Sequence, residues 1–240
     1  NDPVFYVGIK AEDQRASEFS FFAIASATPF SEENNGNIIV YGIPQGGVDV
    51  PDGSPDNPGG NLYVMIAATD AKVGRVIVTN QVTHERLGDF IATLTHEDSN
   101  GENFAVLMNH SFPNGQETGT FRGIYDDSGL GDVVAGAGGG TVLVSDGPGS
   151  LLDFVDMEAA GAWQLTVEDN ALNSTGRVDS ISMLIERALE TEELIWDEKT
   201  AKIHTDKFVK VTQPGEVIYG FGLEAEQDFS YWRILVPKGR

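Results

Sequence analysis

The sequence predicts an all-β protein built as a β-sandwich or jelly roll. Its 28 glycines and 10 prolines can supply the turns that many short strands need. Short apolar or alternating runs recur along most of the 240 residues, whereas only one stretch has a helix-like composition. The hydrophobic content of 40% is enough for a real core.

Residues 1–45 contain three predicted strands. The runs "PVFYVGIKA" and "EFSFFAIASA" alternate with one apolar side, and "NIIVYGI" is a candidate for a buried strand. Residues 44–60 then hold four of the ten prolines and several glycines. This composition predicts a linker or a long loop rich in turns.

From residue 61 to about residue 187 strand signals come at regular intervals. Seven runs fit: "NLYVMIAA", "GRVIVTNQVTH", "GDFIATLTHE", "NFAVLMNH", "GTVLVS", "GAWQLTVED" and "GRVDSISMLIE". The segment "HEDSNGENF" predicts a hairpin turn, and the Gly-rich "AGAGGG" predicts a flexible loop.

The C-terminal part begins with "ERALETEELIWDEKTAK", whose composition suits either a helix or a solvated linker. Three strand-like runs follow: "KFVKVTQ", "GEVIYGFGLE" and "FSYWRILVP". We therefore divide the chain into N-terminal strands (1–45), a central domain (46–187), and a linker with C-terminal strands (188–240).

The run "GAWQLTVED" has a clean strand periodicity. Trp163, Leu165 and Val167 share one face because side chains in a strand repeat every two residues. Trp163 is therefore predicted to lie in the core between two sheets, where its burial contributes about 2–3 kcal/mol. Asp169 closes the strand where the chain turns.

The longer stretch "GAWQLTVEDNALNSTGRVDSISMLI" resembles the closing hairpin of the P domain, also called the P/Homo B domain. That family follows the catalytic domain of subtilisin-like proprotein convertases and recurs in large exported bacterial proteins. Its pattern is G-T-W-x-L-x-V-x-D and then T-G-x-L-x-S-W-x-L. The matching residues are Gly161, Trp163, Leu165, Val167, Asp169, Thr175, Gly176, Val178, Ser180 and Leu184, and Ile181 replaces the second aromatic residue.

Three upstream stretches extend the resemblance over about residues 48–187. "VTHERLGDFIATLTHEDSNGENFAVL" is similar to the family's T-H-x-x-x-G-D-L segment through His84, Gly88 and Asp89, although Glu97-Asp98-Ser99 replaces the family's Ser-Pro. "FRGIYDDSG" and "GPGSLLDF" resemble two later family segments. The resemblance implies a jelly-roll β-sandwich, a fold that agrees with the strand count.

The flanks resemble a different module. "PVFYVGIKAEDQRASEFSFFAIA" is similar to the last strands of bacterial pre-peptidase C-terminal domains. We predict that residues 1–45 and 190–240 together form a second small β-sandwich, with the P-like domain inserted between them. The alternative is that each end belongs to a separate neighbouring domain.

Charge excludes several classes of partner. Lys and Arg total 15 against 37 Asp and Glu, so the net charge is −22. Nucleic acid and anionic membranes would be repelled. The acidic surface can collect cations such as calcium, or it can simply solvate a secreted or salt-tolerant protein. With no cysteine, disulfides, thiolate catalysis and Cys-based zinc sites are absent.

Calcium is the cofactor that the sequence favours. It requires six to eight oxygen ligands, and the resemblance permits it because some P domains hold calcium. The candidate ligands are Asp89, Asp126, Asp127 and Asp169. The alternative for Asp126 and Asp127 is that their side chains bind backbone amides in a turn.

Catalytic signals are weak. The four histidines (His84, His96, His110 and His204) form no H-E-x-x-H motif, and no G-x-S-x-G elbow is present. We predict a non-catalytic structural or interaction module of a large exported bacterial protein, accessory to a protease or other secreted enzyme. Its partners are then neighbouring domains of the same polypeptide or another protein. The alternative is a carbohydrate- or cell-surface-binding module.

The expected location is extracellular or the cell surface. Because the sequence begins at Asn1 rather than Met, we expect it to be a piece of a larger protein whose targeting signals lie elsewhere.

Overall fold

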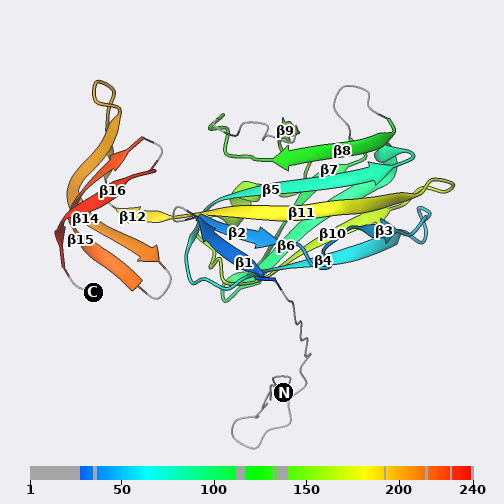
Figure 1. The fold of residues 1–240 in the computed structure, drawn as a ribbon, viewed down its shortest axis with the longest axis horizontal. Coiled ribbons are helices and arrows are strands. Elements are labelled where there is room, and N and C mark those ends of the chain that lie inside the picture. Colours follow the sequence, from blue (N-terminus) through cyan, green and yellow to red (C-terminus); the bar gives the residue numbers. More distant parts are fainter. Residues whose placement is uncertain are drawn as a thin grey trace, which may run out of the picture.

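The structure is a computed structural model that describes residues 28–34, 37–111, 117–131, 133, 140–191, 193–213, 216–227 and 229–238. In these ranges the regular elements are β-strands and short 3-10 turns, so the all-β prediction is confirmed. The strands form three sheets (Figure 1). None of the helical turns in the described ranges is long and apolar enough to cross a membrane.

The first sheet has seven strands in the order β1-β2-β11-β5-β8-β9, with β3 beside β11. Only β8 and β9 pair in parallel within it. The bounds are β1 (Ser31–Asn34), β2 (Asn37–Tyr41), β3 (Val48–Val50), β5 (Val73–His84), β8 (Gly119–Tyr125), β9 (Thr141–Leu143) and β11 (Gly176–Arg187).

The second sheet has four antiparallel strands in the order β4-β10-β6-β7. Their bounds are β4 (Gly59–Ala67), β6 (Phe90–Asp98), β7 (Gly101–Asn109) and β10 (Gly161–Asp169). The predicted hairpin is confirmed, because Asp98 pairs with Gly101 across a two-residue turn. Two 3-10 turns connect strands of these sheets. η2 (Leu87–Asp89) lies between β5 and β6, and η4 (Leu151–Phe154) lies between β9 and β10.

These two sheets share one hydrophobic core, which gives a sandwich-like body. The core cluster comprises 31 buried residues drawn from both sheets. Trp163 is fully buried in it, as its periodicity predicts. The indole Nε1 donates to the Ala159 carbonyl at 2.9 Å, so the ring is buried without an unpaired donor.

The prediction that β10 and β11 form a closing hairpin is wrong. β10 pairs with β4 and β6, whereas β11 pairs with β2 and β5 in the other sheet. A register shift between Val178 and Ser180 places one extra residue in β11. Because of this bulge Val178 and Ile181 both face the core, although simple alternation puts them on opposite sides.

Two segments expected to be irregular or helical contain strands. Within residues 44–60, β3 pairs with β11, so the segment is not only a loop. The Glu-rich stretch expected as a helix or linker contains β12 (Leu189–Thr191) and β13 (Ile195–Asp197), both paired with β14. Pairing with β14 outweighs the local helix preference, because intrinsic helix propensity is small compared with tertiary interactions.

The third sheet has five strands in the order β12-β14-β15-β16, with β13 also on β14. Its longer strands are β14 (Lys202–Gln213), β15 (Glu216–Glu226) and β16 (Trp232–Pro237). In Figure 1 this C-terminal sheet lies beyond the end of β11, at the left in orange and red. Its core cluster has three buried residues: Val209, Leu223 and Ala225.

The N-terminal strands differ in part from the prediction. β2 pairs with β11 and β1 pairs with β2, so residues 31–34 and 37–41 belong to the sandwich-like body and not to a sheet with residues 190–240. In "NIIVY", the alternate residues Ile38 and Val40 are fully buried and lie on the core face of the larger sheet. The two runs predicted within residues 3–27, and the loop "AGAGGG" except Gly140, lie outside the described residues.

Candidate functional site

The four aspartates predicted as calcium ligands lie in two pairs at opposite ends of β5. Arg75, near the start of β5, binds Asp126, whereas His84 at its end binds Asp169. Nine residues of strand separate these two positions by about 30 Å. Over the described ranges, no group of three or more His, Asp and Glu side chains is placed to hold a metal ion. The four acids therefore do not form one site.

Asp126 is buried against Arg75. Nε and Nη2 of Arg75 donate to its two carboxylate oxygens at 3.1 and 2.7 Å, and the Ser128 hydroxyl donates at 3.0 Å. Burial raises the pKa of the Asp126 carboxyl, but the hydrogen bonds from Arg75 and Ser128 outweigh it and hold the pKa below its usual value. This carboxylate already has the donors that a buried charge requires.

Asp127 follows β8 in the chain, and its side chain is hydrogen-bonded to residues at the start of η4. Its Oδ1 accepts the Ser145 N–H at 2.7 Å, and its Oδ2 accepts the Leu151 N–H at 2.7 Å and the Ser150 hydroxyl at 2.6 Å. Burial raises the pKa of this carboxyl, yet these hydrogen bonds lower it more and leave it below the usual value. Asp126 and Asp127 thus make the bonds to backbone amides that the turn alternative describes, and calcium at these two residues stays a prediction.

At the other end of β5, His84 and Asp169 form a buried pair. His84 Nδ1 accepts the Arg86 N–H at 2.9 Å, so Nε2 carries the proton and donates to Asp169 Oδ2 at 3.1 Å. Both side chains are fully buried. Gly176 covers the ring so closely that an added Cβ would lie 1.8 Å from His84 Cδ2. Because both side chains are buried and hydrogen-bonded to each other, the pair stabilises the body.

Asp89 lies beside this pair, next to the Phe90 position that faces Asp169. Its side chain is buried, with Oδ1 at 3.5 Å from Arg86 Nε. Its Oδ2 makes no hydrogen bond to any described residue. Asp89 is thus the one predicted ligand with an oxygen left unsatisfied in this part of the chain, and calcium there stays a prediction.

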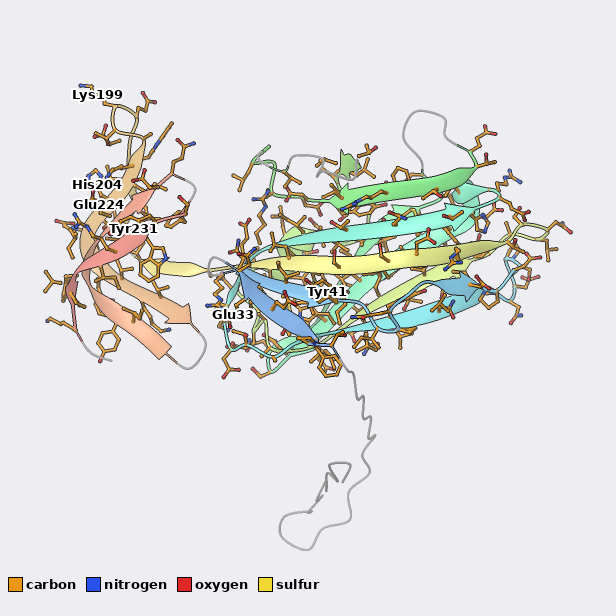
Figure 2. The ribbon with its side chains drawn as sticks, viewed as in Figure 1. Glu33, Tyr41, Lys199, His204, Glu224 and Tyr231 are labelled. Atoms are coloured by element: carbon orange, nitrogen blue, oxygen red, sulfur yellow. The ribbon has the colours of Figure 1, made fainter. Side chains whose placement is uncertain are left out.

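The other histidines have different surroundings. His96 is buried and stacks on Trp163 with ring centroids 3.9 Å apart. His110 Nδ1 lies 2.7 Å from the Gly88 carbonyl. His204 is exposed on the C-terminal sheet, where it pairs across the strands with Glu224 (Figure 2). Each histidine therefore lies in a separate environment.

The C-terminal sheet carries an exposed aromatic cluster. Phe208, Tyr219 and Phe221 are each about 40% exposed although their rings contact one another. Leu235 and Val236 on β16 are more than half exposed, and Val236 pairs with Phe221. Lys238 Nζ lies 4.7 Å above the Phe221 ring. We call these five apolar residues, Phe208, Tyr219, Phe221, Leu235 and Val236, the aromatic face.

Sequence reasoning located the exposed aromatics only in part. In the strand-like run "FSYWRILVP", Trp232 packs against the small core and Tyr231 is exposed. The signal for the aromatic face was present in "KFVKV" and "VIYGFG". There Phe208 directly follows Lys207, and Tyr219 and Phe221 are separated by one glycine, which places both on one side of the strand.

Comparison with known proteins adds no relatives. No protein-family model matches the chain, and no curated protein matches it. The resemblance to the P domain therefore stays a prediction.

Proposed function

We propose that this chain is a non-catalytic accessory module of a large exported protein, and that its C-terminal sheet docks a second β-layer of the same polypeptide. The aromatic face is the observation that carries the proposal. Contiguous exposed apolar residues rimmed by charged ones are typical of interaction surfaces. Here the rim includes Glu224, which accepts hydrogen bonds from Lys202 at 3.0 Å and from Arg233 at 2.7 Å.

The strand order of the sandwich-like body supports a jelly roll. Its eight longest strands, in chain order, are β2, β4, β5, β6, β7, β8, β10 and β11. The first pairs with the last, the second with the seventh, the third with the sixth and the fourth with the fifth. Such nested pairing is expected when a long hairpin wraps into two sheets. It supports a relation to the P domain, and this relation is the ground for proposing an extracellular or cell-surface location.

The geometry of the aromatic face favours protein over sugar as the partner. The Phe208 ring is inclined by 76° to Phe221 and by 38° to Tyr219, so the rings form no flat platform for a sugar. Leu235 and Val236 add aliphatic surface beside them. A ridged apolar surface of this kind matches the inner face of a β-sandwich.

Residues 1–27 are the candidate for the second layer, because their sequence predicts two strands with one apolar side each. This keeps the predicted second small β-sandwich for residues 1–27 alone, because β1 and β2 lie in the sandwich-like body. The absence of cysteine makes cross-linking a clean test in the full chain. Phe21→Cys with Phe208→Cys should give a short bismaleimide cross-link within one chain. Phe21→Cys with Leu62→Cys, on an exposed position of the second sheet, should not.

A cross-link between Phe21→Cys and Phe208→Cys of different chains would replace the same-polypeptide layer by a second copy. Equal cross-linking of both pairs, or none, would contradict docking of residues 1–27. Retention of the chain on immobilised saccharide, lost in Phe208→Ser, would favour the carbohydrate alternative.

A further inference from the structure

A pocket of about 410 Å³ opens on the sandwich-like body at β2, β11 and the loop after β2. Tyr41 at the end of β2 lies at this pocket, on the side of the body shown in Figure 2. Gln45 lines it from the loop, Tyr63 from β4 and Asp179 from the bulge of β11. None of these residues belongs to the predicted metal ligands or to the aromatic face.

Tyr63 is the feature that calls for a ligand. The residue is only 2% exposed, and its hydroxyl has no hydrogen-bond partner among the described residues. Burial raises the pKa of Tyr63 to about 12 against the opposing effect of Arg177, so the hydroxyl stays neutral and can both donate and accept. A buried polar group left unpaired is costly, and in folded proteins such groups usually have a partner.

Asp179 supplies an acceptor that is already fixed in position. Its Oδ1 lies 2.9 Å from Arg177 Nε and its Oδ2 accepts the Thr83 hydroxyl at 2.7 Å. Each carboxylate oxygen has a further lone pair for a ligand hydroxyl. The loop approaches Arg177 closely at Gly47, where φ is +80° and an added Cβ would lie 2.1 Å from Arg177 Nη2.

The charge and the walls of the pocket restrict the ligand class. Glu32 and Asp179 both line it, which disfavours phosphates and carboxylates. The half-buried ring of Tyr41, with Pro29, Pro44 and Ile181, provides apolar walls. Apolar walls with a few fixed polar groups are typical of small-molecule sites of this volume.

A quaternary ammonium ion is the competing class, because it binds aromatic cages. Only Tyr41 offers a ring here, since the Tyr63 ring is packed in the hydrophobic core. Such a cation would also leave the Tyr63 hydroxyl unpaired. A ring with an apolar face and several hydroxyls satisfies both the Tyr41 ring and the Tyr63 hydroxyl.

We propose that this pocket binds a neutral saccharide, with the sugar ring on Tyr41 and its hydroxyls bonded to Tyr63 and Asp179. The site is separate from the aromatic face, so it stands or fails independently of the proposed docking function.

Saturation-transfer difference NMR on the full chain tests the proposal with four probes: maltose, cellobiose, lactose and N,N′-diacetylchitobiose. At least one should receive saturation from the wild type. Tyr63→Phe should weaken its binding by about tenfold or more, since a site built to bind a hydroxyl discriminates strongly when that bond is lost. Because the hydroxyl has no partner in the protein, Tyr63→Phe should unfold at the same temperature as the wild type or higher.

Tyr125→Phe is the matched control, because Tyr125 is equally buried in the same core but does not line the pocket. It should bind the same sugar as the wild type does. The proposal is overturned if no probe receives saturation, or if Tyr63→Phe and Tyr125→Phe bind alike. It is also overturned if tetramethylammonium, and no sugar, binds in a Tyr41-dependent way.

Discussion

The sandwich-like body and the C-terminal sheet differ in how far they bury their apolar residues. Among the side chains that the structure describes, the body buries 31 in one cluster, whereas the C-terminal sheet has three in its core cluster and leaves the five apolar ones of its aromatic face exposed. A core of the first size stabilises a domain by itself, but a single sheet with so small a core does not. This contrast is the reason for our proposal that another layer docks on the C-terminal sheet.

The ion pairs follow the same division. In the body, Arg75 and Asp126 are paired at about 5% side-chain exposure. On the C-terminal sheet, Glu224 binds Lys202 and Arg233 at the surface, and these two cations lower the pKa of Glu224 to about 2. Buried pairs are costly to break, whereas exposed ones contribute little. The substitutions below exploit this difference.

The largest effect is expected from Trp163→Ala. It removes a fully buried ring, its bond to Ala159 and its stacking on His96, and should lower the free energy of unfolding by about 3–5 kcal/mol. Urea unfolding monitored by circular dichroism measures this. Trp196→Ala, on the C-terminal sheet with its side chain 56% exposed, is the control and should change stability by less than about 0.5 kcal/mol. Equal losses would contradict the division into two regions.

Removing one partner of the buried ion pair should come next. Arg75→Leu leaves the Asp126 carboxylate buried without its cation, which should cost about 3 kcal/mol or more. Arg233→Leu breaks the exposed pair with Glu224 and should leave the urea midpoint nearly unchanged. The two variants are compared by the same urea titration, and a larger loss in Arg233→Leu would be inconsistent with this account.

Acid should weaken the body through Asp126 and Asp127. Because their folded pKa values are lowered, their contribution is present above the unfolded value of about 3.9 and is lost as pH falls through the folded values. Asp127→Asn should therefore flatten the acid side of the stability profile. Urea midpoints from about pH 2 to pH 7 measure it. An unchanged slope below about pH 4 would show that these hydrogen bonds do not favour the carboxylate.

Calcium should have the smallest effect. The oxygens of Asp126 and Asp127 are engaged by protein donors, so excess calcium and excess chelator should give thermal midpoints within about 1 °C of each other. A shift of several degrees that disappears in Asp89→Asn and persists in Asp127→Asn would instead place calcium at the unsatisfied Asp89 oxygen.

Local pattern predicted the elements better than their partners. The alternation at Trp163, Leu165 and Val167 correctly gave a core strand, because the period of two is a property of the strand itself. The same pattern contains nothing about which strand lies alongside, so β10 and β11 were assigned to one hairpin although they pair in different sheets. The bulge before Ser180 was equally invisible, since it is set by pairing with β5.

The candidate sites show the same limit. Acidic motifs near strand ends were found, but Arg75 and Asp126 are 51 positions apart, and only the β5–β8 pairing brings them together. Tyr63 lies in a continuous apolar run, "NLYVMIAA", which predicts its burial but not the surroundings of its hydroxyl. Those surroundings depend on β11, more than 100 residues later.

Native-state hydrogen exchange of the full chain, read by mass spectrometry across a series of sub-denaturing urea concentrations, tests the central contrast most directly. We expect amides of β5, β10 and β11 to exchange only through global unfolding. Amides of β14, β15 and β16 should exchange through a smaller opening with a lower free energy. If both regions showed the same opening free energy and the same dependence on urea, the body and the C-terminal sheet would form one cooperative unit, and this account would be wrong.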